Sequence, residues 1–281
     1  MLTKDGPGPA VQLDYWRDRE LDDAYLLKAR MGRFTWEPHV HEEMMVAVSE
    51  AGVGECRTRQ GAQVSGPGTF WVFAPGEYHA GRVEAGRHWA YRGVYLSAAS
   101  IRSVAAGFDA DRPRELFVPP GLYHDPQLAC TLLHVHRRTE RAGALLERQS
   151  QWSLALGSLF DRYGRPKPSV EPRDAGGRRL ALARDYLEAH FREDVSIDDL
   201  ARLCGVSRYH FMRSFRNAYG LPPHAFLNQL RLNAARRALA AGVSPAAAAA
   251  DAGFYDQSVL NRRFKRMFGV TPGRYAQLAK R

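Results

Sequence analysis

Residues 253–276 read GFYDQSVLNRRFKRMFGVTPGRYA. Asp256 is a residue type that caps helix N-termini, and the apolar spacing after it predicts a helix over Gln257–Phe268. Gly253 and Gly269 stand where the chain would leave a helix, because glycine adopts the left-handed conformation without strain. This stretch therefore predicts one capped helix with a tight turn on each side.

A second helix is expected directly upstream. Ser244–Pro245 is typical of a helix start and predicts a short helix over Ala246–Ala252. Gly253 ends that helix, and Phe254–Tyr255 makes the turn to the next one. A short helix, a tight turn and a capped second helix form a helix-turn-helix.

The same pattern occurs 49 residues earlier, in RYHFMRSFRNAYGLPPHAF at residues 208–226. The matching positions are Arg213/Arg262, Phe215/Phe264, Arg216/Lys265, Tyr219/Phe268, Gly220/Gly269, Pro223/Pro272 and Phe226/Tyr275. A repeat of this length indicates that one supersecondary unit occurs twice.

The first copy has the same local signals as the second. Ser196 caps a predicted helix over Ile197–Cys204, and Ser207 caps a second helix over Arg208–Tyr219. A long helix over His224–Ala241 is expected to connect the two copies. The C-terminal part is therefore predicted to be all-α with two helix-turn-helix motifs.

A linker is expected in the middle of the chain. The segment RPKPSVEPRDAGG at residues 165–177 contains three prolines and two glycines, which do not sustain a helix. Residues 166–177 are predicted as the linker. It separates an N-terminal domain of residues 1–165 from a C-terminal domain of residues 178–281.

The positive charge is concentrated in the second domain. Of 281 residues, 40 are Lys or Arg and 30 are Asp or Glu, for a net charge of +10. Residues 1–177 hold 22 basic and 22 acidic side chains, whereas residues 178–281 hold 18 basic and 8 acidic ones. This asymmetry indicates that the second domain binds a polyanion, although a basic, solvated surface would give the same counts.

The second helix of each unit is the expected DNA-reading element. Recognition helices place their N-terminal residues against base edges in the major groove. Two of them on one connecting helix could enter successive grooves about 34 Å apart. The expected DNA-facing residues are Arg208, Tyr209, Met212, Arg213 and Arg216 in the first copy, and Gln257, Ser258, Val259, Asn261, Arg262 and Arg266 in the second. About half of them are expected to touch bases and the others the phosphate backbone.

This arrangement resembles the DNA-binding region of the AraC/XylS family of bacterial transcription regulators. The resemblance covers about residues 178–281 and is most specific over 253–276. The chain departs from the family pattern at two places. One is Val259–Leu260, where many members have His-Phe, and the other is the alanine run Ala246–Ala250. The resemblance implies a domain of two helix-turn-helix units that activates or represses promoters, with double-stranded DNA as partner and RNA polymerase as a further one.

The N-terminal domain has a different pattern. Short apolar runs such as Met44–Val48, Thr69–Phe73 and Trp89–Leu96 alternate with turn signals, which predicts an all-β barrel or sandwich. Two helices, Pro126–Arg141 and Ala144–Tyr163, follow and could cover the barrel or pair with a second subunit. The motifs Pro38-His39-Val40-His41 and Ala74-Pro75-Gly76-Glu77-Tyr78-His79 resemble the two cupin motifs. Through them the domain resembles the cupin-like sensor barrels of the same family, over about residues 25–96.

A small-molecule effector is the expected ligand of this barrel. Candidates for its binding site are Trp36, His39, Glu43, His79, Trp89, Tyr91 and Tyr95, of which alternation allows about half to face inward. Glu43 or Arg92 could bind a charged ligand, although such a residue is more often a surface charge. In this interpretation, effector binding changes how the basic domain is presented to DNA.

A metal-dependent cupin enzyme with an attached DNA-binding domain is the alternative. His39 and His41 are alternate residues of a predicted strand, so they can face one cavity that His79 could join. Three imidazoles suit zinc, iron or nickel. The glutamate of the cupin metal motif is missing, because its expected positions hold Met45 and Val46, and we therefore expect no metal and no enzyme activity. A third possibility is an architectural DNA binder with a vestigial barrel.

The remaining signals are mostly negative. The sequence has no P-loop, no GxSxG elbow and no GxGxxG, so no cofactor is expected. Three scattered cysteines, no secretory signal and no long apolar run favour a cytoplasmic location without membrane association. The linker and the two appended helices make a homodimer the expected assembly.

Overall fold

The computed structural model describes residues 11–18, 24–106, 116–140, 145–166 and 175–279. The chain folds as two compact units, which divide near residue 167. In the described residues, no helix combines the length and the low polarity that a membrane crossing requires.

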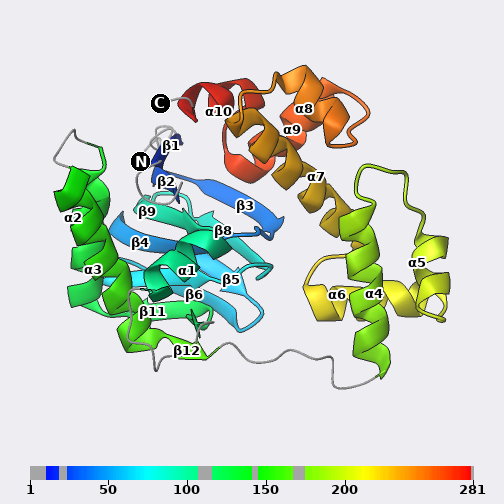
Figure 1. Ribbon diagram of the computed structural model, residues 1–281, viewed down its shortest axis with the longest axis horizontal. Helices are drawn as coiled ribbons and strands as arrows, with labels where there is room; N and C mark the ends of the chain where they lie inside the picture. Colours follow the sequence, from blue (N-terminus) through cyan, green and yellow to red (C-terminus); the bar gives the residue numbers. More distant parts are fainter. Residues whose placement is uncertain (1–10, 19–23, 107–115, 141–144, 167–174, 280–281) are drawn as a thin grey trace, which may run out of the picture. The chain divides into compact units, whose positions relative to one another are not determined.

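The N-terminal unit contains two antiparallel sheets (Figure 1). The larger has the strand order β1-β2-β9-β4-β7-β11, and the smaller has the order β3-β8-β5-β6. The strands are β1 (Gln12–Asp18), β2 (Ala24–Met31), β3 (Phe34–His39), β4 (Met44–Gly52), β5 (Gly54–Thr58), β6 (Gly61–Ser65), β7 (Thr69–Phe73), β8 (His79–Val83), β9 (Trp89–Leu96) and β11 (Gly121–His124), with a separate short pair β10 (Leu116–Phe117) and β12 (Arg165–Pro166). The predicted all-β cupin-like barrel with appended helices is confirmed in this form.

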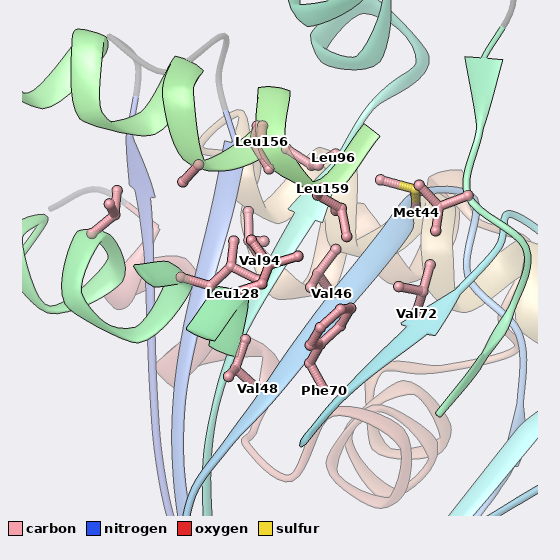
Figure 2. Packing of buried hydrophobic residues seen from close by; sticks show 14 of the residues in the cluster. Met44, Val46, Val48, Phe70, Val72, Val94, Leu96, Leu128, Leu156 and Leu159 are labelled. Carbon is pink, nitrogen blue, oxygen red and sulfur yellow. The ribbon is translucent and has the colours of Figure 1, made fainter. Parts of the chain in front are cut away.

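Helices cover one face of the larger sheet. They are α1 (Ala98–Ala106), α2 (Pro126–Arg138) and α3 (Leu145–Tyr163). Figure 2 shows Leu128 of α2 and Leu156 and Leu159 of α3 packed against Val46 and Val94 of the sheet. Full burial of each such side chain contributes about 1.5–3 kcal/mol. The two appended helices therefore cover the sheet of their own subunit.

Strand β4 lies at the centre of the larger sheet, paired with β7 on one side and β9 on the other. Its first six residues are all buried, because α2 and α3 cover one face and the smaller sheet covers the other. A strand buried on both faces reads as a continuous apolar run, as Met44–Val48 does.

The C-terminal unit is helical. Its elements are α4 (Ala175–Ala189), α5 (Ile197–Leu203), α6 (Arg208–Tyr219), α7 (Pro223–Ala240), α8 (Pro245–Asp251), α9 (Gln257–Phe268) and α10 (Pro272–Leu278). The bounds of α6 and α9 are those that the caps predicted. Ser207 and Asp256 accept backbone hydrogen bonds at their N-termini, and Gly220 and Gly269 end them in the left-handed conformation.

The sequence repeat produces the same aromatic packing twice. Phe215 and Tyr219 have ring centroids 4.5 Å apart, and their counterparts Phe264 and Phe268 are 4.4 Å apart. The third ring of each trio, Phe226 or Tyr275, lies 5.5 Å from Phe215 or Phe264. The two copies are therefore one packing unit used twice, as the sequence predicted.

The linker differs from its predicted bounds at both ends. Pro166 pairs in β12, and α4 already includes Ala175 and Gly177. Residues 167–174 of the predicted linker lie outside the described residues.

Candidate DNA-binding surface and effector site

Helix α6 separates its apolar and polar positions sharply. Phe211 and Phe215 are fully buried. All five residues predicted to face DNA are exposed: Arg208, Tyr209, Met212, Arg213 and Arg216. Two of them, Tyr209 and Met212, are large apolar side chains that are 75% and 42% exposed. Apolar side chains at such positions can contact thymine methyl groups.

Helix α9 has the same division. Leu260 and Phe264 are fully buried in the helical core. The predicted positions Gln257, Ser258, Arg262 and Arg266 are exposed, whereas Val259 and Asn261 are half-buried. The two half-buried side chains therefore lie at the edges of the exposed face.

The turns before the two recognition helices differ by one residue. Val206 and Phe254 occupy the same place, because their N–H groups donate to carbonyls five residues back, those of Ala201 and Ala249. Ser207, the N-cap of α6, follows Val206 directly. In the second unit, Tyr255 stands between Phe254 and Asp256, the N-cap of α9. Tyr255 is 97% exposed. The 49-residue period of the recognition helices does not show this extra residue, so Tyr255 was not among the residues predicted to face DNA.

An ion pair connects the two helices of the first unit. The carboxylate of Asp198, in the first turn of α5, accepts hydrogen bonds from Nε and Nη2 of Arg208 at the start of α6. The Arg208 side chain remains 66% exposed. Arg208 was predicted from the sequence to face DNA, whereas Asp198 was not.

The space between the two sheets of the N-terminal unit is filled with aromatic side chains. Trp36 of β3 meets Trp89 and Tyr91 of β9, with ring centroids 6.2 and 6.0 Å apart. Burial raises the pKa of Tyr91 well above its usual value. We call Trp36, Phe73, His79, Trp89 and Tyr91 the interior aromatic cluster; all five are buried. Tyr95, on the same face of β9, is half-buried.

Glycines on the facing strands make room for these rings. A Cβ at Gly54 would lie 2.2 Å from the Trp89 ring, and one at Gly81 would lie 2.9 Å from the Trp36 ring. Trp89 Nε1 also donates to Ser49 Oγ at 3.2 Å, which satisfies its polar atom inside the domain. Small residues and aromatic rings thus fit together across the two sheets.

Three of the predicted site residues lie differently from their expected places. Strand β3 ends at His39, so His39 and His41 are not alternate residues of one strand; their ring centroids are 6.4 Å apart. Pro38 lacks the N–H that a continuing ladder requires, which is consistent with the strand ending there. Glu43 precedes β4 in a bend and is not a strand residue.

The imidazole of His79 contacts Glu77 and Phe73. Its Nδ1 lies 3.0 Å from the Glu77 carbonyl oxygen, and its ring stacks on Phe73 with centroids 4.1 Å apart. Among the described residues, no three His, Cys, Asp or Glu side chains come close enough together to hold a metal ion.

Arg92 faces away from the interior aromatic cluster. It is buried on the other face of β9, where it pairs with Glu50 and Glu140 and contacts His136 of α2. Its guanidinium is therefore engaged within the domain, so Arg92 fits neither of the two alternatives, a contact to a charged ligand or a surface charge.

Two family models match the chain. An AraC-like ligand binding domain matches residues 24–156, and a helix-turn-helix domain matches residues 200–278. Together they span about three quarters of the chain. The boundary between them agrees with the division into two compact units.

Curated relatives are named as transcription regulators. YbfI of Bacillus subtilis, an uncharacterised HTH-type transcriptional regulator, is 26% identical over 243 residues and covers 84% of each chain. The HTH-type transcriptional regulator MtrA of Neisseria gonorrhoeae is 34% identical over 86 residues, 30% of this chain and 28% of that protein.

Solved structures share the two-domain fold. ToxT from Vibrio cholerae covers 96% of this chain and 98% of its own with a TM-score of 0.54 at 11% identity. Unsaturated fatty acid bound ToxT from the same species has a TM-score of 0.54 at 9% identity, with 99% and 98% covered. With a ligand-binding domain before a double helix-turn-helix domain, the chain belongs to the AraC family of transcription regulators.

Proposed function

We propose that this regulator binds promoter DNA in the cytoplasm by placing α6 and α9 in successive major grooves. The observation that carries the proposal is the repeated geometry of the two units, each of which buries its phenylalanines and exposes a basic, polar face. The connecting helix α7 has 18 residues, which corresponds to a length of about 27 Å. That length suits two helices that enter grooves about 34 Å apart.

The exposed side chains have distinct expected partners. Arg208, Arg213 and Arg262 match the acceptor pair of guanine, and Gln257 matches adenine. Val259, Tyr209 and Met212 suit thymine methyl groups. The remaining predicted residues, Arg216, Ser258, Asn261 and Arg266, are assigned to phosphates or to base edges at the limits of the site.

Selection of bound fragments from genomic DNA tests this proposal. The purified full chain should recover one motif with two half-elements about one helical turn apart, and a salt titration should separate the charge contribution from base recognition. Recovery of sequence-independent, steeply salt-sensitive binding alone would contradict it.

For the N-terminal domain, the proposed effector is a small apolar or aromatic molecule that contacts the interior aromatic cluster. Pockets for small molecules combine apolar walls with a few polar groups, and here His79 and Tyr91 supply the polar groups. The ToxT structure with a bound unsaturated fatty acid makes such a fatty acid a sensible first compound to test.

Tryptophan fluorescence gives a direct readout of this site. All five tryptophans, at positions 16, 36, 71, 89 and 152, lie in the N-terminal domain. A ligand of the cluster should change this emission, and Trp36→Phe should reduce the change without altering DNA affinity in the absence of ligand. An emission change that persists undiminished in Trp36→Phe would place the ligand elsewhere.

A homodimer through α3 is proposed as the assembly, and RNA polymerase as a partner at the promoter. Leu146 and Leu154 of α3 are 76% and 72% exposed and stand eight residues apart, on neighbouring sides of the helix. Sedimentation of the full chain should show a dimer that Leu146→Glu together with Leu154→Glu converts to a monomer. A monomeric wild-type chain at micromolar concentration would refute the dimer.

A further inference from the structure

Two acidic residues follow the N-cap of α5, and their carboxylates have different partners. Ser196 Oγ accepts a hydrogen bond from the Asp199 N–H at 3.1 Å and donates one to the Asp199 carboxylate at 2.6 Å. Asp199 also accepts from Arg202 at 2.9 Å. These bonds make Asp199 part of the helix cap. Asp198, one residue earlier, binds the guanidinium of Arg208 on the next helix instead.

The ion pair leaves one edge of the guanidinium open. A guanidinium has five N–H groups in one plane. Asp198 occupies the edge formed by Nε and Nη2 of Arg208, so the edge between Nη1 and Nη2 still offers two N–H groups. Two parallel donors match O6 and N7 of guanine in the major groove. Because the side chain is 66% exposed, this edge is accessible from solvent.

The pair favours base recognition over phosphate binding. A carboxylate beside Arg208 offsets its positive charge and so weakens its attraction for a phosphate. Base recognition depends on hydrogen-bond geometry. The ion pair improves that geometry because it holds the long, flexible side chain of Arg208 in one orientation. A free arginine side chain has many rotamers, and the ion pair restricts them before DNA binds, so less conformational entropy is lost on binding.

The second unit has no ion pair at the positions that match Asp198 and Arg208. Ser244 caps α8 as Ser196 caps α5, and the position that matches Asp198 holds Ala246. The position that matches Arg208 holds Gln257, the first residue of α9. A glutamine at this place pairs with adenine. The two recognition helices therefore begin with different chemistry.

We infer that Asp198 is a positioning residue that fixes Arg208 for recognition of a guanine in the half-element bound by α6. At the matching position of the half-element bound by α9, Gln257 selects adenine without such support. This inference rests on the proposed function, in which α6 enters the major groove.

Selection from a randomised DNA library with the full chain tests the inference. Wild type, Arg208→Ala, Asp198→Asn and the control Asp199→Asn are compared for base preference at every position and for total affinity. Arg208→Ala should lose about 10-fold of the preference for guanine at one base pair, the ratio that corresponds to a bidentate contact of about 1.4 kcal/mol. Asp198→Asn should lose part of that preference at the same base pair. Asp199→Asn removes the same charge one residue away and should keep it.

Each contrary outcome has a distinct meaning. Equal effects of Asp198→Asn and Asp199→Asn would show a general charge effect and overturn the positioning role. A gain in guanine preference for Asp198→Asn would show that the carboxylate occludes Arg208, which also overturns it. A uniform loss of affinity in Arg208→Ala would make this residue a phosphate contact and overturn it as well. Absence of any base preference in wild type would instead refute the proposed function.

Discussion

Arg92 and His136 meet behind strand β9, where Nη1 of Arg92 lies 3.3 Å from Nδ1 of His136. The other imidazole nitrogen, Nε2, lies 3.1 Å from the Gly93 carbonyl oxygen and donates to it. With Nε2 protonated, Nδ1 accepts from Arg92, so the ring is neutral. Burial, followed by the charge of Arg92, lowers the pKa of His136 to about 4. A neutral buried imidazole thus helps hold α2 to the sheet.

This histidine predicts how stability depends on pH. Its pKa is about 4 in the folded chain against an ordinary value of 6.5, so the unfolded state binds more protons between these pH values. The contribution of His136 is complete above about pH 6.5 and is lost as the pH falls toward 4. The difference corresponds to about 3 kcal/mol. Urea unfolding followed by tryptophan fluorescence at pH 7.5, 6.0 and 5.0 should show about 2 kcal/mol of this loss, since the remainder falls below pH 5.

The matched control for this pH effect is on the same helix. His134 stands two residues from His136 on α2 and is exposed. His136→Gln should flatten the fall in stability between pH 6.5 and 5, whereas His134→Gln should leave it unchanged. Burial opposes ionisation of Glu50 and Glu140, but hydrogen bonds to arginine and lysine lower the pKa of both carboxylates. These carboxylates therefore change the pH dependence of stability only at lower pH. Equal pH profiles for the two glutamine variants would remove His136 from the explanation.

Replacement of Arg92 should destabilise the N-terminal domain more than replacement of an exposed arginine in a similar pair. Arg92→Met keeps the aliphatic stem but leaves Glu50 and Glu140 with only their more exposed partners, Arg137 and Lys28, and should cost about 1.5–3 kcal/mol. Arg82→Met breaks the pair with Glu55, where the arginine side chain is 51% exposed and water screens its charge, and should cost clearly less stability. Fluorescence-detected urea unfolding compares the two. Equal losses would contradict a structural role for the buried network.

The interior packing predicts a steric effect at Gly54. Gly54→Ala would place a methyl group 2.2 Å from the Trp89 ring, and the resulting overpacking should destabilise the domain by about 1–3 kcal/mol. Gly66→Ala is the control, because its Cβ would lie 3.3 Å from a Val53 methyl group. Unfolding midpoints of the two variants should differ clearly. Wild-type stability in Gly54→Ala would mean that the space between the sheets is looser than described.

The recognition helices predict specific losses in DNA affinity. Arg213→Ala and Arg262→Ala should each weaken binding to the selected site by about 1–3 kcal/mol if they read bases. Arg202→Ala removes an exposed arginine of α5 outside the two recognition helices and should change the affinity little. Fluorescence anisotropy with labelled duplexes measures all three. Unchanged affinity in both Arg213→Ala and Arg262→Ala would refute the assigned faces.

His39 separates effector response from DNA binding. His39→Ala should spare affinity for DNA and reduce the response to a ligand, because the residue is half-buried at the end of β3 and belongs to neither recognition helix. Loss of folding in this variant would instead indicate a structural role. Circular dichroism, measured before the binding assays, distinguishes the two results.

Local signals explain why the recognition helices could be predicted residue by residue. An N-cap such as Asp256 and a terminal glycine such as Gly269 act within one turn of the helix, so the sequence alone contains the information. The aromatic repeat then predicted which side of each helix is buried. Helix α1, with the sequence AASIRSVAA, was not predicted.

Relationships between distant segments could not be predicted in this way. Alternation along β9 says that Tyr91 and Arg92 face opposite sides, but both sides are covered, so the pattern does not say which one is the interior. The contact between Asp198 and Arg208 depends on how α5 and α6 cross, and the contact between Arg92 and His136 on how α2 lies on the sheet. The spacing of His39 and His41 suggested one strand, but β3 ends between them.

The central claim is that α6 and α9 read one DNA site together, and a spacing experiment tests it most directly. The affinity of the full chain is measured for its selected site and for the same site with about five base pairs inserted between the half-elements. Half a helical turn puts the second half-element on the opposite face of the duplex, so binding should fall to that of a single half-element. Unchanged affinity for the site with the insertion would contradict simultaneous binding by the two units.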